Sequence, residues 1–284
     1  MKMLKKKSFR TIGLLMFVTV MALALVIPHN VAQAALNFKD SFIHATASDY
    51  EKAFKIGDSL PDDNIKNTTH DPQKMDEFSG IGKVVRDSKG TSTGGGTGFV
   101  ISKHQIVTNQ HVVSSTKGNQ YPADSFYFYP QMNKDDVPLK FHVKSIQTKS
   151  TRDIAVLTVD EDLTKYVKPL KIADNEKIKD MKSGEKAFMV GYPRAGGDNN
   201  GRLMIKAEGN YLRPTQDRIE HMSKMTRYSG NSGSPVMNKD NEVIGIHAHG
   251  IHPDVSAPSE KQQIYTGGPT LMGSNGTFVR SFIK

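Results

Sequence analysis

The sequence predicts an all-β fold made of two antiparallel barrels. Short runs rich in β-branched and aromatic residues recur along the chain, separated by clusters of Gly, Asn, Asp and Pro. Stretches with helical periodicity are few, and there is neither an internal repeat nor a low-complexity linker. These observations favour many short strands joined by turns over a helical or α/β architecture.

The strand-like runs define the expected elements in order. We expect a division between the barrels near residues 165–180, with a first barrel over about 59–170 and a second over about 171–284. Residues 277–283 predict a short C-terminal helix. The expected strands span 81–85, 97–101, 125–129, 141–146, 154–159, 187–191, 203–207 and 242–248.

The glycine-rich stretch Gly94–Gly98 could suggest a nucleotide site. It lacks the Gly-Lys-Ser/Thr ending of a phosphate loop and the spacing of a dinucleotide fingerprint. We interpret it as a flexible entry into a strand, and we expect no cofactor.

The N-terminus has the three parts of a secretory signal peptide. An apolar run over 12–27 follows a basic stretch, and Ala32 and Ala34 offer small residues at the −3 and −1 positions of a cleavage site after Ala34. The alternative is a membrane anchor, but the run is shorter than the roughly 20 residues of a spanning helix. We therefore expect residues 1–34 to be a signal peptide and the protein to be secreted and extracellular, without stable membrane association. The basic residues are Lys2, Lys5, Lys6, Lys7 and Arg10.

Composition limits what the remaining chain can be. Residues 35–58 have mixed polarity and few turn signals, which is typical of a propeptide too small to build a core, and 59–284 would be the folded domain. The absence of cysteine excludes disulfides and thiol redox chemistry, and the domain is large enough to bury a core without them. The net charge is +9, but no Lys/Arg stripe alternates with aromatics, so we expect a solvated basic surface and no nucleic-acid partner.

Three segments together supply Ser, His and Asp. His111 lies in Thr108–Val113, Asp153 in Arg152–Leu157, and Ser232 in Gly230–Pro235. A serine hydroxyl becomes a nucleophile only when an imidazole takes its proton and a carboxylate orients that imidazole. Subtilisin-type chains carry the order Asp, His, Ser and α/β-hydrolases the order Ser, Asp/Glu, His, so the order here fits only the chymotrypsin type. We predict that His111, Asp153 and Ser232 are catalytic.

The context of each residue supports this prediction. His111 and Asp153 both lie at the ends of strand-like runs. A Gly-x-Ser-Gly sequence by itself is an ordinary polar turn. Beside the other two segments, its glycines suit a tight bend that aims two N–H groups at one developing oxyanion. We expect the N–H groups of Gly230 and Ser232 to be those donors.

The chain resembles the glutamyl endopeptidases of Gram-positive bacteria, the V8-protease type of the chymotrypsin-like clan. The motifs TNQHVV and GNSGSPV and the segment Asn241–His247 carry the resemblance, which covers about Ser59 to the C-terminus. It implies two six-stranded barrels with the site in the cleft between them. It also implies a zymogen that is activated by another protease, and a monomeric endopeptidase that cuts protein or peptide substrates after Glu and less readily after Asp.

The resemblance gives His247, fifteen residues after Ser232, the role of binding the substrate glutamate. A carboxylate that enters a partly dry pocket must meet cations or donors, since desolvation otherwise outweighs binding. The alternative is a hydrogen-bonded core histidine. His247, His249 and His252 are also close enough in sequence to suggest a metal, but no Cys accompanies them and no open metal site is indicated, so we expect none.

The chain departs from the V8 pattern at Arg227, five residues before Ser232, where that protease has a threonine. Two interpretations remain open. In the first, Arg227 binds the substrate carboxylate through a bidentate pair. In the second, Arg227 points to solvent and Thr226 or Ser229 takes the hydroxyl role.

Ser59 is the expected mature N-terminus, because it lies about fifty residues before His111, as in the V8-type enzymes. The resemblance implies that its new α-ammonium group helps to bind the substrate carboxylate. Three functions remain open: an active Glu-specific endopeptidase, a narrow-specificity protease like the exfoliative toxins, and an idle binding protein on a protease fold. The complete set of catalytic residues argues against the third, and digestion of a denatured unrelated protein separates the first two.

Overall fold

The structure is a computed structural model that describes residues 41–88, 91–149, 151–196, 199–251 and 264–283. The expected signal peptide, residues 1–34, and the start of the expected propeptide lie outside the described residues. Within the described ranges no helix is both long and apolar enough to cross a membrane.

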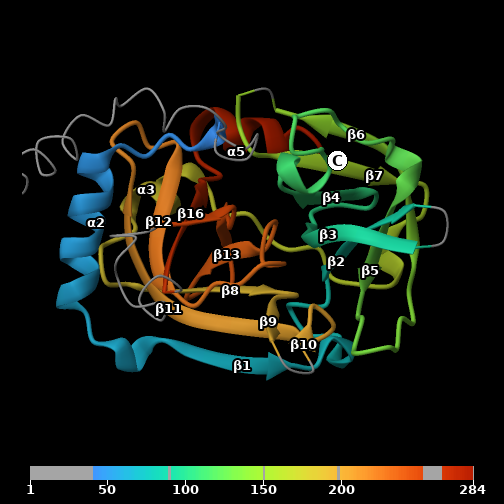
Figure 1. The fold of residues 1–284 in the computed structure, drawn as a ribbon, viewed down its shortest axis with the longest axis horizontal. Coiled ribbons are helices and arrows are strands. Elements are labelled where there is room, and N and C mark those ends of the chain that lie inside the picture. Colours follow the sequence, from blue (N-terminus) through green and yellow to red (C-terminus); the bar gives the residue numbers. More distant parts are fainter. Residues whose placement is uncertain (1–40, 89–90, 150, 197–198, 252–263, 284) are drawn as a thin grey trace, which may run out of the picture. The chain divides into compact units, whose positions relative to one another are not determined.

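Six strands close into the first barrel, as the sequence predicts (Figure 1). They pair in the order β2-β3-β4-β7-β6-β5, and all the pairings are antiparallel. Buried residues alternate with partly exposed ones along β5, the pattern of a strand with one face toward a core. The strands are β2 (Ile81–Ser88), β3 (Thr91–Val100), β4 (Gln105–Thr108), β5 (Phe126–Pro130), β6 (Phe141–Thr148) and β7 (Ala155–Val159).

The second sheet has eight strands, seven of them from the second half of the chain, rather than the expected six. Seven strands run in the order β14-β13-β8-β11-β12-β16-β15, and β1 joins at β11. The all-β, chymotrypsin-like fold class is confirmed despite this difference in strand number. The strands are β1 (Lys66–His70), β8 (Lys186–Gly191), β11 (Met204–Pro214), β12 (Glu220–Met225), β13 (Pro235–Asn238), β14 (Val243–Ile246), β15 (His249–Gly250) and β16 (Tyr265–Pro269).

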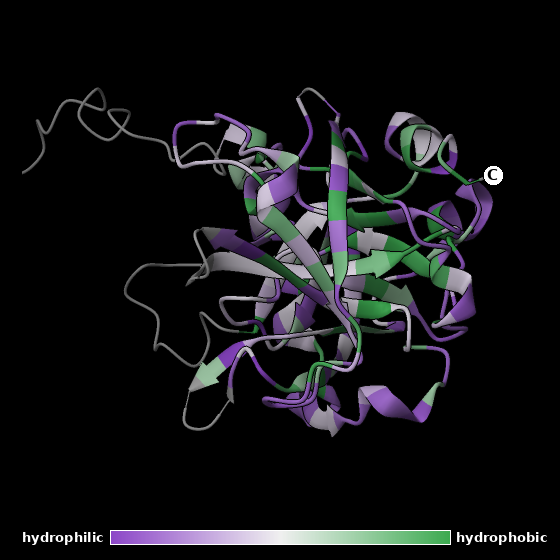
Figure 2. Cartoon of the chain, turned by 90° about the vertical axis from the view of Figure 1, so that its right-hand side faces the viewer, coloured by the Kyte–Doolittle hydropathy of each residue, from purple (hydrophilic) through white to green (hydrophobic). Residues whose placement is uncertain are grey.

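Minor elements connect the sheets. Two short strands, β9 (Arg194–Gly196) and β10 (Asn199–Asn200), pair with each other, and short 3-10 turns span 62–64, 72–74, 110–112, 123–125 and 163–165. Helix α3 (Asn175–Asp180) precedes β8, and α5 (Gly273–Arg280) is the expected C-terminal helix, beginning earlier than predicted. Figure 2 shows hydrophobic residues along the strands and hydrophilic residues prominent in the connecting loops.

The expected start of the first barrel at residue 59 is wrong, because β1 belongs to the second sheet. β1 pairs with β11 in a register that places Lys66 opposite Glu208 and His70 opposite Met204. The partner strand β12 pairs with β11 only from Gly209 onward. β1 therefore covers the part of the β11 edge that β12 leaves open, which is the usual reason for a strand to add to a sheet.

Most of the described part of the expected propeptide is helix α2 (Ala47–Ser59), which packs against β11 and β12 (Figure 1). Thr46 caps the helix, and the Thr46 and Asp49 side chains and backbone amides form a reciprocal capping box. α2 builds no core of its own, as expected for so short a segment, but it completes an apolar cluster of the second sheet. That cluster joins Ala53, Tyr50, Phe54, Ile56 and Leu60 to Leu212, Met222, Ile251 and Tyr265.

Candidate active site

Ser232 lies in a tight turn before β13, and this turn requires glycine. Gly230 and Gly233 have φ angles of 97° and 90°, in the left-handed region. A Cβ at Gly233 would lie 1.9 Å from the carbonyl oxygen of Thr97, and one at Gly230 would lie 2.5 Å from that of Tyr192. Both glycines are therefore needed for the close backbone packing around Ser232.

The buried Thr97 on β3 fastens this turn to the first barrel. Its amide donates to the carbonyl of Ser232 at 2.8 Å, and its hydroxyl donates to the carbonyl of Gly230 at 2.9 Å. The same hydroxyl accepts the amide of Tyr192 at 3.0 Å. Sequence reasoning missed Thr97, whose only signal is its place within the glycine-rich stretch Gly94–Gly98.

Strand pairing brings His111 and Asp153 together. Thr108 at the end of β4 lies opposite Ala155 at the start of β7, so the residues just beyond these strand ends are neighbours. His111 Nδ1 lies 2.6 Å from Asp153 Oδ2, and the His111 amide donates to Asp153 Oδ1 at 2.9 Å. Asn109, also missed by sequence reasoning, donates through its side chain to the carbonyl of Asp153 at 2.8 Å.

This pairing sets the tautomer of the imidazole. Asp153 is nearly fully buried, with 4% of its side chain exposed, and His111 is 14% exposed. A carboxylate 2.6 Å away accepts a hydrogen bond from Nδ1–H, so the proton of the neutral ring stays on Nδ1 and Nε2 is the basic nitrogen.

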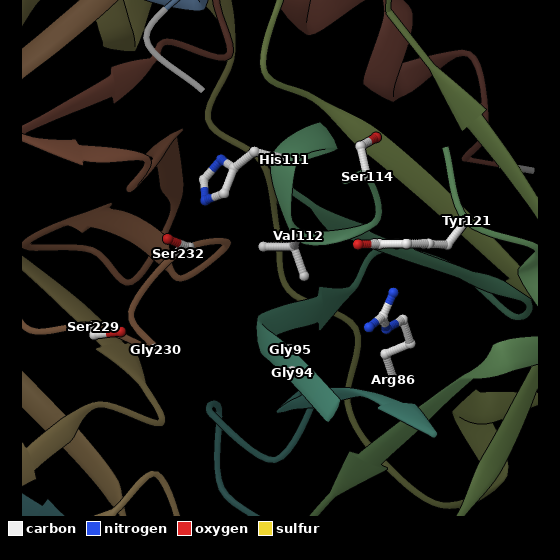
Figure 3. Close-up of a pocket in the computed structure, with 10 residues that line it drawn as sticks. All are labelled: Arg86, Gly94, Gly95, His111, Val112, Ser114, Tyr121, Ser229, Gly230 and Ser232. Carbon is white, nitrogen blue, oxygen red and sulfur yellow. The ribbon is translucent and has the colours of Figure 1, made fainter. Parts of the chain in front are cut away.

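A cavity of about 340 Å³ joins His111 to Ser232 (Figure 3). Gly230 and Ser229 line it from the side of the second sheet, and Arg86 and Tyr121 from the side of the first barrel. All three residues predicted as catalytic are thus brought to one place, since Asp153 lies directly behind His111.

The amides of Gly230 and Ser232 are the expected oxyanion donors. Neither donates a hydrogen bond to an acceptor among the described residues, although neighbouring amides of the turn are paired: Asn231 donates to Tyr228 and Ser234 to Asn231. Both residues line the cavity. Two such N–H groups have the capacity to bind an anionic oxygen there.

His247 lies directly against the Ser232 turn through its backbone. Its amide donates to the carbonyl of Ser234 at 2.9 Å, and its carbonyl accepts the amide of Gly233 at 3.0 Å. The side chain is buried, and its Nδ1 forms a hydrogen bond with the hydroxyl of Thr266 on β16. Sequence reasoning missed Thr266, which becomes a neighbour only through the pairing of distant strands.

Arg227 does not extend into solvent. It is partly buried, and burial lowers the pKa of its guanidinium group. Its guanidinium packs on Gly250, where a Cβ would lie 1.9 Å from Cζ. Gly250 is paired with Thr266, the hydrogen-bond partner of His247, so the two residues expected to recognise a carboxylate lie in one neighbourhood. Of the two alternative hydroxyls, Thr226 is buried and Ser229 lines the cavity.

The structure does not bring Ser59 into contact with His247. Ser59 is the exposed last residue of α2, and its hydroxyl donates to the carbonyl of Ile56 at 2.6 Å. Beside it, Lys224 on β12 is only 3% exposed. Sequence reasoning also missed Lys224, whose only signal is an inward position in a short strand.

Of the three histidines that could suggest a metal site, the structure describes His247 and His249. His252 lies outside the described residues, and His249 faces Glu220, with 3.5 Å between Nε2 and Oε2. Among the described residues there is no group of three or more His, Cys, Asp or Glu side chains able to hold a metal ion.

A scan against protein families matches residues 96–246 to the trypsin-like peptidase domain, which is more than half of the chain. The chain belongs to the trypsin-like peptidase family. The matched residues include His111, Asp153 and Ser232 and end one residue before His247.

Individual relatives agree with membership of the trypsin-like peptidase family. The chain is 31% identical to a glutamyl endopeptidase of Staphylococcus epidermidis over 163 residues, which are 55% of this chain and 54% of the relative. A solved Glu endopeptidase matches 76% of this chain and 95% of its own, with a TM-score of 0.61 and 21% identity. An inactivated protease paralogue of the scabies mite matches 76% of this chain and 97% of its own, with a TM-score of 0.58 and 16% identity. At these identities the solved structures establish the fold.

Proposed function

We propose that this trypsin-like peptidase is a secreted serine endopeptidase that hydrolyses peptide bonds after Glu and, less readily, after Asp. The observation that carries the proposal is the 2.6 Å pairing of His111 with Asp153 across one cavity from Ser232. The family match and the glutamyl endopeptidase relative support the same reaction.

In the proposed mechanism, His111 Nε2 takes the proton of the Ser232 hydroxyl as its oxygen attacks the substrate carbonyl. Asp153 stabilises the imidazolium that forms, because its carboxylate already holds Nδ1. The amides of Gly230 and Ser232 bind the oxyanion of the tetrahedral intermediate; one such donor is worth about 10²–10³ in rate.

After this step His111 acts first as an acid and then again as a base. The imidazolium of His111 gives its proton to the leaving amine, and the substrate acyl group remains bonded to the Ser232 oxygen. Water then enters, His111 takes a proton from it, and the acyl-enzyme is hydrolysed with return of the proton to Ser232.

The proposed preference for Glu depends on His247 and Arg227. His247 lies beside the Ser232 turn, and Arg227 packs on Gly250, opposite the Thr266 that His247 contacts. Burial around the two side chains strengthens their interaction with a carboxylate. His247 donates a hydrogen bond, and Arg227 supplies a permanent positive charge.

We further propose that maturation removes residues 1–34 as a signal peptide and then 35–58, with a new N-terminus near Ser59 produced by an activating protease. Since Ser59 ends a docked helix, its α-ammonium group would reach the specificity site only after cleavage and rearrangement. The mature protein would act as a monomer on protein or peptide substrates.

The deciding experiment is a digest of a denatured unrelated protein, with all new termini mapped by mass spectrometry. We expect cuts after most Glu residues and after a minority of Asp residues, and none with Ser232→Ala. Cuts at only a few of many Glu sites would favour the narrow-specificity alternative. No cut at all by mature protein would favour the idle binding protein.

A further inference from the structure

The cavity beside Ser232 extends to a stacked arginine that the mechanism above does not use. Arg86 on β2 places its guanidinium carbon 3.7 Å from the centroid of the Tyr121 ring, a close cation–π contact. Both residues line the same cavity as His111 and Ser232 (Figure 3). The guanidinium is therefore presented to whatever molecule occupies the cavity.

Neighbouring contacts hold this pair in position. Arg86 lies in the middle of the sheet, with Phe126 opposite on β5 and Gly94 opposite on β3. The amide of Tyr121 donates to the carbonyl of Val113 at 2.9 Å, which ties Tyr121 to the turn that carries His111. An arginine that is already ordered loses little conformational entropy when it binds an anion.

The cavity also has room beside the arginine. Gly94 and Gly95 line it with φ angles of 153° and 148°, which favour glycine. A Cβ at Gly94 would meet no atom within 4 Å, so the missing side chain leaves open space. A substrate side chain has space to enter next to Arg86.

Arg86 gives the lining of the cavity a positive charge. The described lining residues include no Asp or Glu. The adjacent Asp87 lines a different cavity together with Lys83 and Lys134. Asp153 is almost fully buried behind His111. The lining comprises Arg86, Gly94, Gly95, His111, Val112, Ser114, Tyr121, Ser229, Gly230 and Ser232.

The position of the cavity relative to the scissile bond follows from the proposed function. The side chain before the bond enters the region of Arg227 and His247, and neither residue lines this cavity. His111 must protonate the amine that leaves, so the chain after the bond departs past His111. Because three extended residues span about 10 Å, the first three residues after the bond are the ones that lie near this cavity.

Resting on the proposed endopeptidase function, we infer that Arg86, stacked on Tyr121, forms a subsite for an acidic side chain. That side chain belongs to one of the first three residues after the scissile bond. A guanidinium and a carboxylate form charge-assisted, bidentate hydrogen bonds, and the ring of Tyr121 orients the guanidinium plane.

The test uses peptides with Glu before the scissile bond and with Glu or Gln at each of the three positions after it. Gln keeps the shape of Glu and removes the charge. Mass spectrometry of the products follows only the cut after the first, shared Glu, because an added Glu is itself a cleavage site. At one of these positions we expect the mature enzyme to cut this bond with about threefold to tenfold higher kcat/KM in the Glu peptide than in the Gln peptide. In Arg86→Met the Glu-to-Gln ratio of kcat/KM falls to about one. In Arg86→Glu, a peptide with Lys at the same position becomes preferred over the Glu peptide.

Two variants separate recognition from structure. Lys140→Met is the matched control, because Lys140 stacks on Tyr127 at 4.0 Å in the same barrel but does not line this cavity, and it must keep the ratio. Tyr121→Phe keeps the ring and the ratio, whereas Tyr121→Leu lowers it.

Two results would overturn the subsite: a Glu-to-Gln ratio of one at all three positions in the parent enzyme, or an unchanged ratio in Arg86→Met. An enzyme that cleaves none of the peptides would instead overturn the proposed function, and the subsite with it.

Discussion

Lys224 Nζ donates to the carbonyl of Gly57 at 2.8 Å, so a buried cation on β12 holds the C-terminal turn of helix α2. The same ammonium donates to the carbonyl of Leu60 at 2.8 Å and pairs with Asp62 Oδ1 at 2.5 Å. Lys224 therefore contacts the chain on both sides of Ser59, where we expect the mature N-terminus. Cleavage there would remove one of its three partners and keep the other two.

We predict that Lys224→Met weakens the docking of α2. The substitution removes the hydrogen bonds from Lys224 to the carbonyls of Gly57 and Leu60 and the ion pair with Asp62, which costs about 1–3 kcal/mol of unfolding free energy. Urea unfolding in a Ser232→Ala background, where self-cleavage is absent, measures the effect. Lys55→Met, on the exposed face of the same helix, should change stability by less than about 0.5 kcal/mol. Equal stability of Lys224→Met and its parent would contradict the prediction.

Ser232→Ala and His111→Ala should each lower kcat/KM by several orders of magnitude. Because the residues act as one unit, the double variant should be scarcely slower than either single variant. Asp153→Asn should cost about 10⁴ in kcat, since an amide favours the wrong tautomer of His111. Steady-state kinetics on a Glu peptide gives these values, with Ser114→Ala as a control in the same cavity. Near-normal turnover by purified Ser232→Ala would exclude a serine-protease mechanism.

Substitution of His247 or Arg227 should change the substrate preference more than it changes folding. We expect Arg227→Met to lower the Glu-to-Gln preference before the scissile bond by about tenfold, the value of one charge-assisted bidentate contact. His247→Ala should lower cleavage after Glu further, while thermal unfolding shows a folded protein. His104→Ala, at a half-buried bend before β4, is the control. An unchanged preference in His247→Ala would remove that residue from the specificity site.

Stability should fall in mild acid because of His221. Burial lowers the pKa of His221 from 6.5 to about 4. The unfolded chain therefore binds more protons between these values, so this stabilising contribution is complete above pH 6.5 and is lost as the pH falls toward 4. The slope is at most about 1.4 kcal/mol per pH unit. Urea unfolding at several pH values should show a shallower dependence for His221→Gln than for the parent, and identical slopes would contradict the assignment.

Maturation should be needed for full activity. N-terminal sequencing of the active protein should find a start within a few residues of Ser59, and uncleaved precursor should be poorly active on Glu peptides. The physical reason is that the amine of Ser59 is still part of a peptide bond at the end of α2 and carries no charge. A fully active, Glu-selective enzyme that retains residues 35–58 would disprove this prediction.

Local sequence determined the fold class and the candidate residues. Alternating apolar residues predict strands wherever one face meets a core, and the motifs around His111, Asp153 and Ser232 need only a few neighbouring residues to be recognised. The order of these residues along the chain indicated the chymotrypsin-like arrangement, and the closed first barrel agrees with it.

Long-range pairing decided the rest. β1 joins the second sheet because β11 has an uncovered edge, a property of the register between β11 and β12. Thr97, Thr266, Lys224 and the pair of Arg86 with Tyr121 gain their roles from contacts with segments distant in sequence. No local pattern encodes such contacts, because side-chain neighbours across a sheet depend on which strands pair and in which register.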